Sequence, residues 1–203
     1  KLIPEITIGD AEINQKDSIS SSSYIVNNMM NLTGEIGWDL WNSLSDSVKN
    51  LLIDLAPDND KYITTKLSSL DFITSISQVL EELIYEEIRK LDISSKPDKA
   101  RIIEIIENKL DFKIPEGYYF VSDVYYSSAL DRQKSTLNAM TLVYLGLTNN
   151  YYFDKLKNAG FIEYVMNISE LRGHGNTVNL VVNDEDRINL RKKLFDILKI
   201  IGG

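Results

Sequence analysis

The sequence predicts a mainly α-helical fold. Apolar residues recur at steps of three and four along most of the 203 residues, which is the spacing of one face of a helix. Hydrophobic residues make up 43% and charged residues 26% of the chain, as in ordinary globular proteins, so a sizeable core can form. The stretch Phe161–Val182 departs most clearly from this pattern, because it carries two β-prone runs around a glycine-containing polar segment.

An acidic helical region is predicted over residues 1–95, and residues 1–23 within it are expected to form a flexible arm. The arm contains the polar run DSISSSS, which offers too little apolar surface to pack. The polar segment DISSK directly before Pro97 marks the expected domain boundary. A second domain is therefore predicted over residues 96–203.

Two long helices are expected in the first region. One runs from Gly37 to Leu55 and places Trp38 and Trp41 on one core-facing side. The other runs from Leu70 to Leu91, with four glutamates on a solvated outer face. In the second region, helices are expected over Lys99–Leu110, Thr136–Leu145, Asn149–Asn158 and Asp184–Ile201.

The stretch YYFDKLKNAGFIEYVMNISELRGHGNTVNLVV resembles the second half of a winged helix-turn-helix domain. Asn158-Ala159-Gly160 is typical of a helix C-terminus. Antiparallel strands are expected over Phe161–Met166 and Thr177–Val182, joined by a polar loop that contains His174. The resemblance covers only the C-terminal part of the chain and implies a winged-helix domain, a small β-hairpin wing on a helical body, over residues 96–203.

The resemblance implies that this domain binds double-stranded DNA. In the alignment that we favour, Thr136–Leu145 is the positioning helix and Asn149–Asn158 is the recognition helix that enters the major groove. In a second alignment, the recognition helix begins near Asp131. The residues expected to contact DNA are Asn149, Asn150, Tyr151 and Lys155 in the first alignment, Arg132 and Lys134 in the second, and Arg172, His174 and Asn176 at the tip of the wing.

Charge is distributed unevenly along the chain, whose net charge is −8. Residues from Asp131 onward carry 10 Lys and Arg against 8 Asp and Glu, whereas residues 1–130 carry 12 against 22. The basic excess at the C-terminal end suits the phosphates of DNA, and the acidic region is expected to bind a protein partner. The apolar stripe of Asp184–Ile201 is expected to pair two copies of the chain in a homodimer.

The expected function is non-catalytic DNA binding, in transcription control or in the replication or partition of a small replicon. One alternative is a winged-helix adaptor that contacts only protein. A second alternative is a ribonuclease of the HEPN family, which the segment Arg172-Gly173-His174 suggests. That family is all-helical and uses an Arg and a His that are four to six residues apart, whereas Arg172 stands two residues before His174.

We expect no catalytic residues, no metal site and no cofactor. The chain has no Cys and a single His, which excludes disulfides, thiol catalysis and the common zinc sites. Pro97-Asp98 and Glu107-Asn108-Lys109 match the letters of a metal-dependent nuclease motif, but Glu107 falls within an expected helix, so we interpret the match as accidental. No apolar run reaches the roughly 18 residues that a membrane span requires. The lack of Cys fits a cytoplasmic protein.

Overall fold

The computed structural model describes residues 25–56, 68–110, 121–174 and 181–202. These residues are mainly helical and include no strand, which confirms the mainly α prediction. Besides a helix over residues 25–36, the helices are α2 (Trp38–Ser43), α3 (Asp46–Ile53), α5 (Ser69–Lys90), α6 (Lys99–Leu110), α7 (Asp123–Leu130), α8 (Leu137–Leu147), α9 (Asn150–Asn158), α10 (Phe161–His174) and α11 (Asp184–Ile201).

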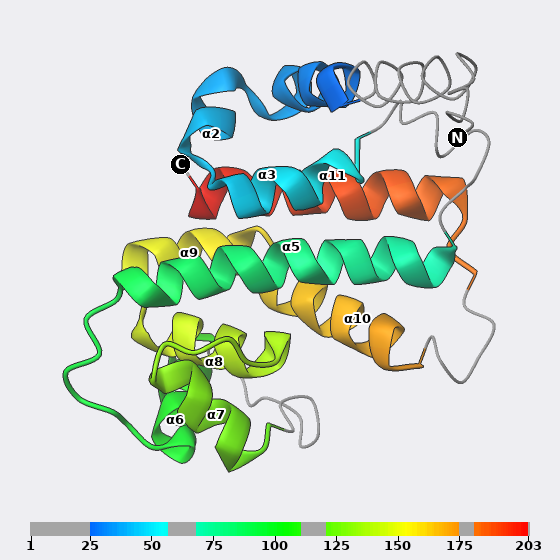
Figure 1. Cartoon of the computed structure of the whole chain (residues 1–203). Coiled ribbons are helices and arrows are strands. Elements are labelled where there is room, and N and C mark those ends of the chain that lie inside the picture. Colours follow the sequence, from blue (N-terminus) through cyan, green and yellow to red (C-terminus); the bar gives the residue numbers. More distant parts are fainter. Residues whose placement is uncertain (1–24, 57–67, 111–120, 175–180, 203) are drawn as a thin grey trace, which may run out of the picture.

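Helix α5 crosses the middle of the molecule and separates two groups of helices (Figure 1). It packs against α3 and α11 on one side and against α8 and α10 on the other. Its bounds match the helix predicted over Leu70–Leu91, and Ser68 caps it by accepting a hydrogen bond from the backbone N–H of Asp71. The domain boundary predicted at residues 95 and 96 falls between α5 and α6, and it stays a prediction. Packing of α5 against α8 joins the two predicted regions.

Helix α8 is buried on nearly all sides. From Leu137 to Gly146, every residue except Asn138 is buried, as expected for a helix that is apolar all round. A Cβ atom at Gly146 would lie 2.5 Å from the Ile102 side chain of α6, so the glycine allows these two helices to approach closely. Helix α9 begins after a short link at Thr148 and Asn149. Both helices of the favoured alignment are therefore present.

Helix α11 covers the same chain with the apolar stripe that was expected to join two copies. Its predicted bounds are confirmed, and Asn183 caps it by accepting a hydrogen bond from the backbone N–H of Asp186. Leu194, Ile197 and Ile201 of the stripe are buried, where α11 packs against α5 and α9. The homodimer stays a prediction, but this stripe no longer supports it.

The strand predicted over Phe161–Met166 is wrong, because these residues form the first turns of α10. Gly160, with a φ of 63°, ends α9 and turns the chain directly into α10. Phe161, Val165 and Ile168 are buried at helical spacing, where α10 packs against α5 and α8. Their burial in a helical core overrides their β-propensity.

This correction removes the first of the two strands on which the winged-helix prediction rests. Residues 175–180, which hold most of the second predicted strand, lie outside the described residues, and Val181 and Val182 have no regular secondary structure. The polar loop predicted from Ser169 is likewise helical as far as His174. The wing therefore does not form from the two runs that predicted it.

The helix predicted over Gly37–Leu55 is two helices, α2 and α3. Ser45 interrupts it because its side chain accepts a hydrogen bond from the backbone N–H of Val48 and so caps α3. Trp41 is 5% exposed and packs in the core, but Trp38 is 56% exposed, so the shared core face predicted for the two is wrong. The arm predicted over residues 1–23 lies outside the described residues.

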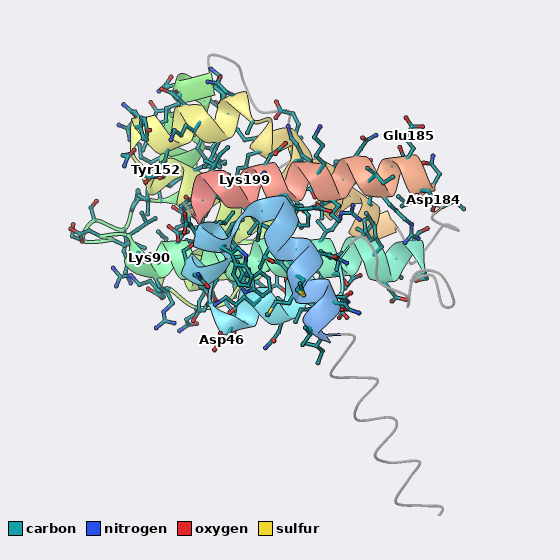
Figure 2. All side chains as sticks on the ribbon, turned by 90° about the horizontal axis from the view of Figure 1, so that it is seen from above. Asp46, Lys90, Tyr152, Asp184, Glu185 and Lys199 are labelled. Atoms are coloured by element: carbon teal, nitrogen blue, oxygen red, sulfur yellow. The ribbon has the colours of Figure 1, made fainter. Side chains whose placement is uncertain are left out.

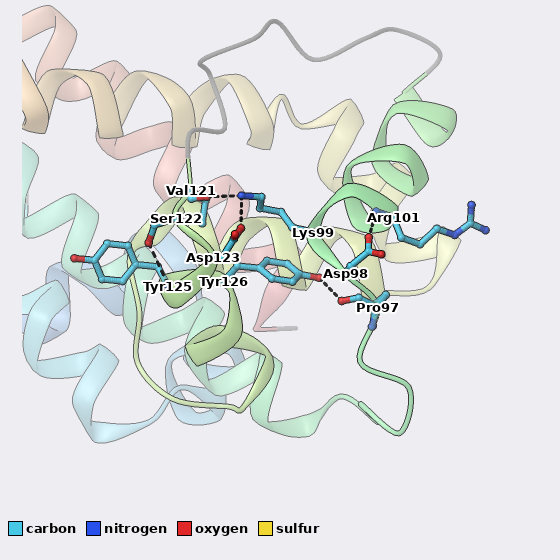
Figure 3. A network of polar contacts seen from close by, with 9 residues as sticks. All are labelled: Pro97, Asp98, Lys99, Arg101, Val121, Ser122, Asp123, Tyr125 and Tyr126. Atoms are coloured by element: carbon cyan, nitrogen blue, oxygen red, sulfur yellow. Dashed lines mark hydrogen bonds and ion pairs between the residues drawn. The ribbon is translucent and has the colours of Figure 1, made fainter.

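Polar contacts hold the start of α6 against α7 (Figure 3). The Lys99 ammonium donates to the carboxylate of Asp123 at 2.6 Å, and the Tyr126 hydroxyl donates to the backbone oxygen of Pro97 at 2.8 Å. Burial raises the pKa of Tyr126 to about 12, and the carboxylate of Asp98 adds to the effect. These contacts fix α7 beside α8, against which it packs.

Candidate nucleic-acid interface

Helix α9 turns one face to solvent. Asn150, Tyr151, Tyr152 and Lys155 are exposed on it, with Tyr151 at 63%. The Lys155 ammonium lies 4.3 Å from the centroid of the Tyr151 ring, and the rings of Tyr151 and Tyr152 meet edge to face. We call these four residues the α9 face; they combine aromatic area, an amide and a cation, which are the groups that contact bases and phosphates.

Asn149, which was expected to contact a base, caps α9 instead. Its side-chain oxygen accepts a hydrogen bond of 3.1 Å from the backbone N–H of Tyr152. That oxygen is therefore engaged in holding the first turn of the helix. Asn150, one residue further on, is exposed at the first position of α9, so it is the better placed of the two to contact a partner.

Basic residues are frequent on α9 and on the adjoining part of α11, although the whole chain is acidic. Helix α9 itself carries the exposed Lys155 and Lys157 against one Asp. Residues 191–201 of α11, a helix that packs against α9, carry four basic residues and one Asp. In Figure 2 Tyr152 of α9 and Lys199 of α11 lie on the same side of the molecule, and Asp46 of α3 lies on the other. The basic residues of this segment are Lys192, Lys193, Lys199 and Arg191, of which Arg191 pairs with Glu35 at 3.7 Å.

The recognition helix predicted near Asp131 is wrong. Helix α7 ends at Leu130, and the residues from there to Thr136 are not helical. Arg132 has a φ of 58° and donates to the backbone oxygen of Leu91 at 2.6 Å. A left-handed residue at this position ends the helical path of α7, which excludes the second alignment.

Lys134 pairs with the Glu82 carboxylate of α5 at 2.5 Å, and its side chain is 65% exposed. The hydrogen bond that Lys134 donates to Glu82 is the main cause that raises the pKa of Lys134, so the ammonium keeps its charge. The predicted acidic outer face of α5 is thus partly neutralised, because Glu81 and Glu87 are also paired with cations.

Arg172, expected at the tip of a wing, lies on α10. Its Nη1 donates to the hydroxyl of Ser77 at 2.8 Å and to the carboxylate of Glu81 at 2.5 Å, both on α5. His174 is the last residue of α10, and Asn176 lies outside the described residues. The helical course of α10 is the physical reason for this correction, since it brings Arg172 onto α5 rather than to a hairpin tip.

Arg172 and Lys134 line one cleft, although each was predicted in a different role. The cleft has a volume of about 690 Å³ and is bordered by α5, α7, α8 and α10. Ser169 donates to the side-chain oxygen of Asn138 within it at 2.6 Å. We call it the Arg172 cleft; its remaining polar and charged lining residues include Ser77, Glu81, Ser128, Ser135 and Thr136. Sequence reasoning missed these residues because they come from helices that are far apart in the chain.

The carboxylates of the nuclease-like motif do not meet. Asp98 accepts a hydrogen bond from the backbone N–H of Arg101 at the start of α6, and Glu107 lies in the last turns of the same helix. Nine residues of helix separate them by about 13 Å along the axis, at about 1.5 Å per residue, so they cannot hold one metal ion together. Within the described ranges, no three His, Asp or Glu side chains cluster as metal ligands.

The described part of the chain satisfies the all-helical condition of the HEPN resemblance but not its spacing, since Arg172 precedes His174 by two residues.

Among the described helices, none combines the length and apolar character needed to cross a membrane. Comparison with protein-family models, with curated proteins and with solved structures finds no match. A functional assignment therefore rests on the α9 face and on the Arg172 cleft.

Proposed function

We propose that this protein binds duplex DNA without catalysis and that α9 is the helix that enters the major groove. The observation that carries the proposal is the α9 face, which stands exposed directly after the buried helix α8. A helix that enters a groove needs one solvent-facing side with polar and cationic groups and a second side that anchors it. Phe153 and Leu156 supply the anchor, because both are buried.

The charges around the α9 face support contact with phosphates. Lys155 and Lys157 on α9 are exposed, as are Lys192 and Lys199 within residues 191–201 of α11. In a winged-helix protein the wing contacts the DNA backbone, and we propose that residues 191–201 of α11 make that contact in this protein. We extend the proposal to the roles expected from the sequence, in transcription control or in a small replicon.

The test is a titration of the full chain with duplex DNA at several salt concentrations, read by fluorescence anisotropy. We expect the affinity to fall steeply with salt, because bound phosphates release their counterions. Lys155→Ala should weaken binding about equally on a selected site and on scrambled DNA, and should lower the salt slope by about one unit. Asn150→Ala should weaken binding mainly on the selected site.

Lys49→Ala is the matched control, because it removes the same charge from α3, where Lys49 pairs with Asp46. Asp46 lies away from α9 in Figure 2, so this variant should bind DNA as the wild type does. Equal losses in Lys155→Ala and Lys49→Ala would show that α9 is not the contact surface. Absence of salt-dependent binding by the wild type would contradict the proposal itself.

A protein adaptor is the second candidate, and exposed apolar side chains in the acidic first region favour it. Val26 and Met30 are 50% and 60% exposed on the helix over residues 25–36, and Trp38 is exposed beside it. Large exposed apolar side chains of this kind are common in protein-binding surfaces. A chain that fails to bind DNA at any salt concentration would leave this candidate standing.

The same samples test the proposed absence of catalysis. Incubation of the full chain with RNA or DNA in the presence of Mg²⁺ should leave both intact. Cleavage that His174→Ala abolishes would instead support the ribonuclease alternative, which the spacing of Arg172 and His174 disfavours.

A further inference from the structure

We propose that the Arg172 cleft binds a nucleoside monophosphate as a free small molecule. The proposal does not depend on DNA binding by α9, because it rests on other residues. Its volume of about 690 Å³ lies within the range of roughly 300–1,000 Å³ that is usual for small-molecule sites. A cationic side and an aromatic edge line the same cleft, and these two features match the phosphate and the base of a nucleotide.

The cationic side consists of Arg172 from α10 and Lys134 from the segment before α8. The described contacts of Arg172 to Ser77 and Glu81 use only its Nη1 atom. A guanidinium carries five N–H donors, so Nη2 and Nε can still hold a phosphate while Nη1 stays on Glu81. The Lys134 ammonium has three donors and gives one of them to Glu82.

Three hydroxyl groups lie on the phosphate side but donate their hydrogen bonds within the protein. Ser77, Ser135 and Ser169 contribute hydroxyl groups to the lining, and each comes from a different segment of the chain. Ser135 already donates to the backbone oxygen of Tyr125 at 2.7 Å, which fixes its position at the cleft. Ser169 donates to Asn138 and Ser77 donates to Glu81, so the single O–H of each of the three hydroxyl groups is engaged within the protein. The hydrogen-bond donors to a phosphate therefore come from the two cations.

The charge balance of the cleft selects the size of the phosphate. Glu81 lines the cleft together with the two cations, and Glu82 lies against Lys134. Together these two cations and two carboxylates carry no net charge. A monophosphate suits this balance better than a triphosphate, because each additional phosphate brings negative charge close to these two carboxylates.

The aromatic edge is formed by α7. Val124 and Tyr125 are 73% and 50% exposed, and both line the cleft. Exposed aromatic rings beside a cationic groove provide a face on which a nucleobase stacks, whichever base it is. The base is therefore expected on Tyr125, with the phosphate between Arg172 and Lys134.

Isothermal titration calorimetry of the full chain with AMP tests the proposal. We expect one AMP bound per chain, and binding at least ten-fold weaker in Arg172→Ala and in Lys134→Ala. Tyr125→Ala should weaken AMP and leave inorganic phosphate unchanged, because only AMP has a base to stack. ATP should bind more weakly than AMP. Arg101→Ala is the control, since it removes a surface cation that pairs with Glu104 on α6 and does not line the cleft.

Arg172→Lys controls for a folding defect, because it keeps the positive charge of the side chain and loses only the planar set of guanidinium N–H donors. It should fold as the wild type does by circular dichroism and bind AMP with intermediate strength. The proposal is overturned if AMP, GMP, CMP and UMP all fail to bind at millimolar concentration, or if the Arg172 and Lys134 variants bind as the wild type does. Tighter binding of a 5′-phosphorylated tetranucleotide than of AMP would overturn the assignment to a free mononucleotide. DNA binding by Arg172→Ala should be unchanged, which separates this test from that of α9.

Discussion

Helices α8 and α9 follow each other along the chain, but they meet solvent in opposite ways. Nearly every residue of α8 is buried, whereas α9 buries only Phe153 and Leu156. The sequence explains the difference, because LNAMTLVYLGL carries no charge and NYYFDKLKN carries three charged side chains. Burying an unpaired charge is strongly unfavourable, so α9 must keep one side in water. Substitutions in α8 should therefore change stability, and those on the α9 face should change binding.

The largest expected effect is that of Leu142→Ala in α8. Leu142 is fully buried, so the change should lower the free energy of unfolding by about 2–5 kcal/mol through lost burial and a residual cavity. Tyr151→Ala on α9 removes more atoms from a side chain that is 63% exposed, and it should change stability by only about 0.5 kcal/mol. Urea denaturation followed by circular dichroism measures both. Similar losses in the two variants would contradict the contrast between the helices.

The next effect is a loss of stability at alkaline pH. Burial raises the pKa of Tyr144 in α8 and that of Tyr164 in α10, and it raises the pKa of Tyr126 to about 12. Because the folded-state pKa lies above the unfolded value near 10, the neutral phenols stabilise the fold fully below pH 10. The contribution of Tyr126 should be lost as the pH rises from about 10 to about 12, and the contributions of the other two phenols should begin to fall above about pH 10 as well.

Urea denaturation at pH 8, 10 and 11 measures this effect. Tyr126→Phe should reduce the dependence on pH, because it removes one of the three phenols, and it should lower stability at pH 8 through loss of the hydrogen bond to Pro97. An unfolding free energy that stays constant from pH 8 to pH 11 would show that the buried phenols do not control alkaline stability.

The smallest expected effect separates Asn149 from Asn150. Asn149→Ala should lower the free energy of unfolding by about 1 kcal/mol through loss of the α9 cap, and Asn149→Ser should restore most of it. Asn150→Ala should change stability by less than about 0.5 kcal/mol. If Asn149 serves only as a cap, Asn149→Ser should also bind DNA as the wild type does. An Asn149→Ser variant that is stable but has lost DNA affinity would show that Asn149 contacts DNA.

The long amphipathic helices could be predicted from the sequence because their signals are local. The bounds of α6 and α11 match their predictions, and Asn183 caps α11 as predicted. Gly160 has the positive φ that the turn after α9 requires. Apolar spacing and capping residues act within a few turns of the chain, so they do not depend on which other segments pack nearby.

The exposed polar residues of α9 could be proposed from the sequence, but the Arg172 cleft could not. Its lining comes from α5, α7, α8 and α10, so only the packing of these helices brings Ser77 and Arg172 within hydrogen-bond distance. Arg172 lies 95 residues from Ser77 along the chain. No local pattern carries information about a contact over that separation.

The sequence by itself determined that this chain is mainly helical and that α9 has one polar face. Only the tertiary structure decided that Phe161–Met166 is helical, because a short apolar run fits a buried helix as well as a strand. The run does hold Phe161, Val165 and Ile168 at helical spacing, but its β-prone composition outweighs that signal until α5 and α8 cover it. Burial against those two helices is a property of the folded chain, so it settles what local propensity leaves open.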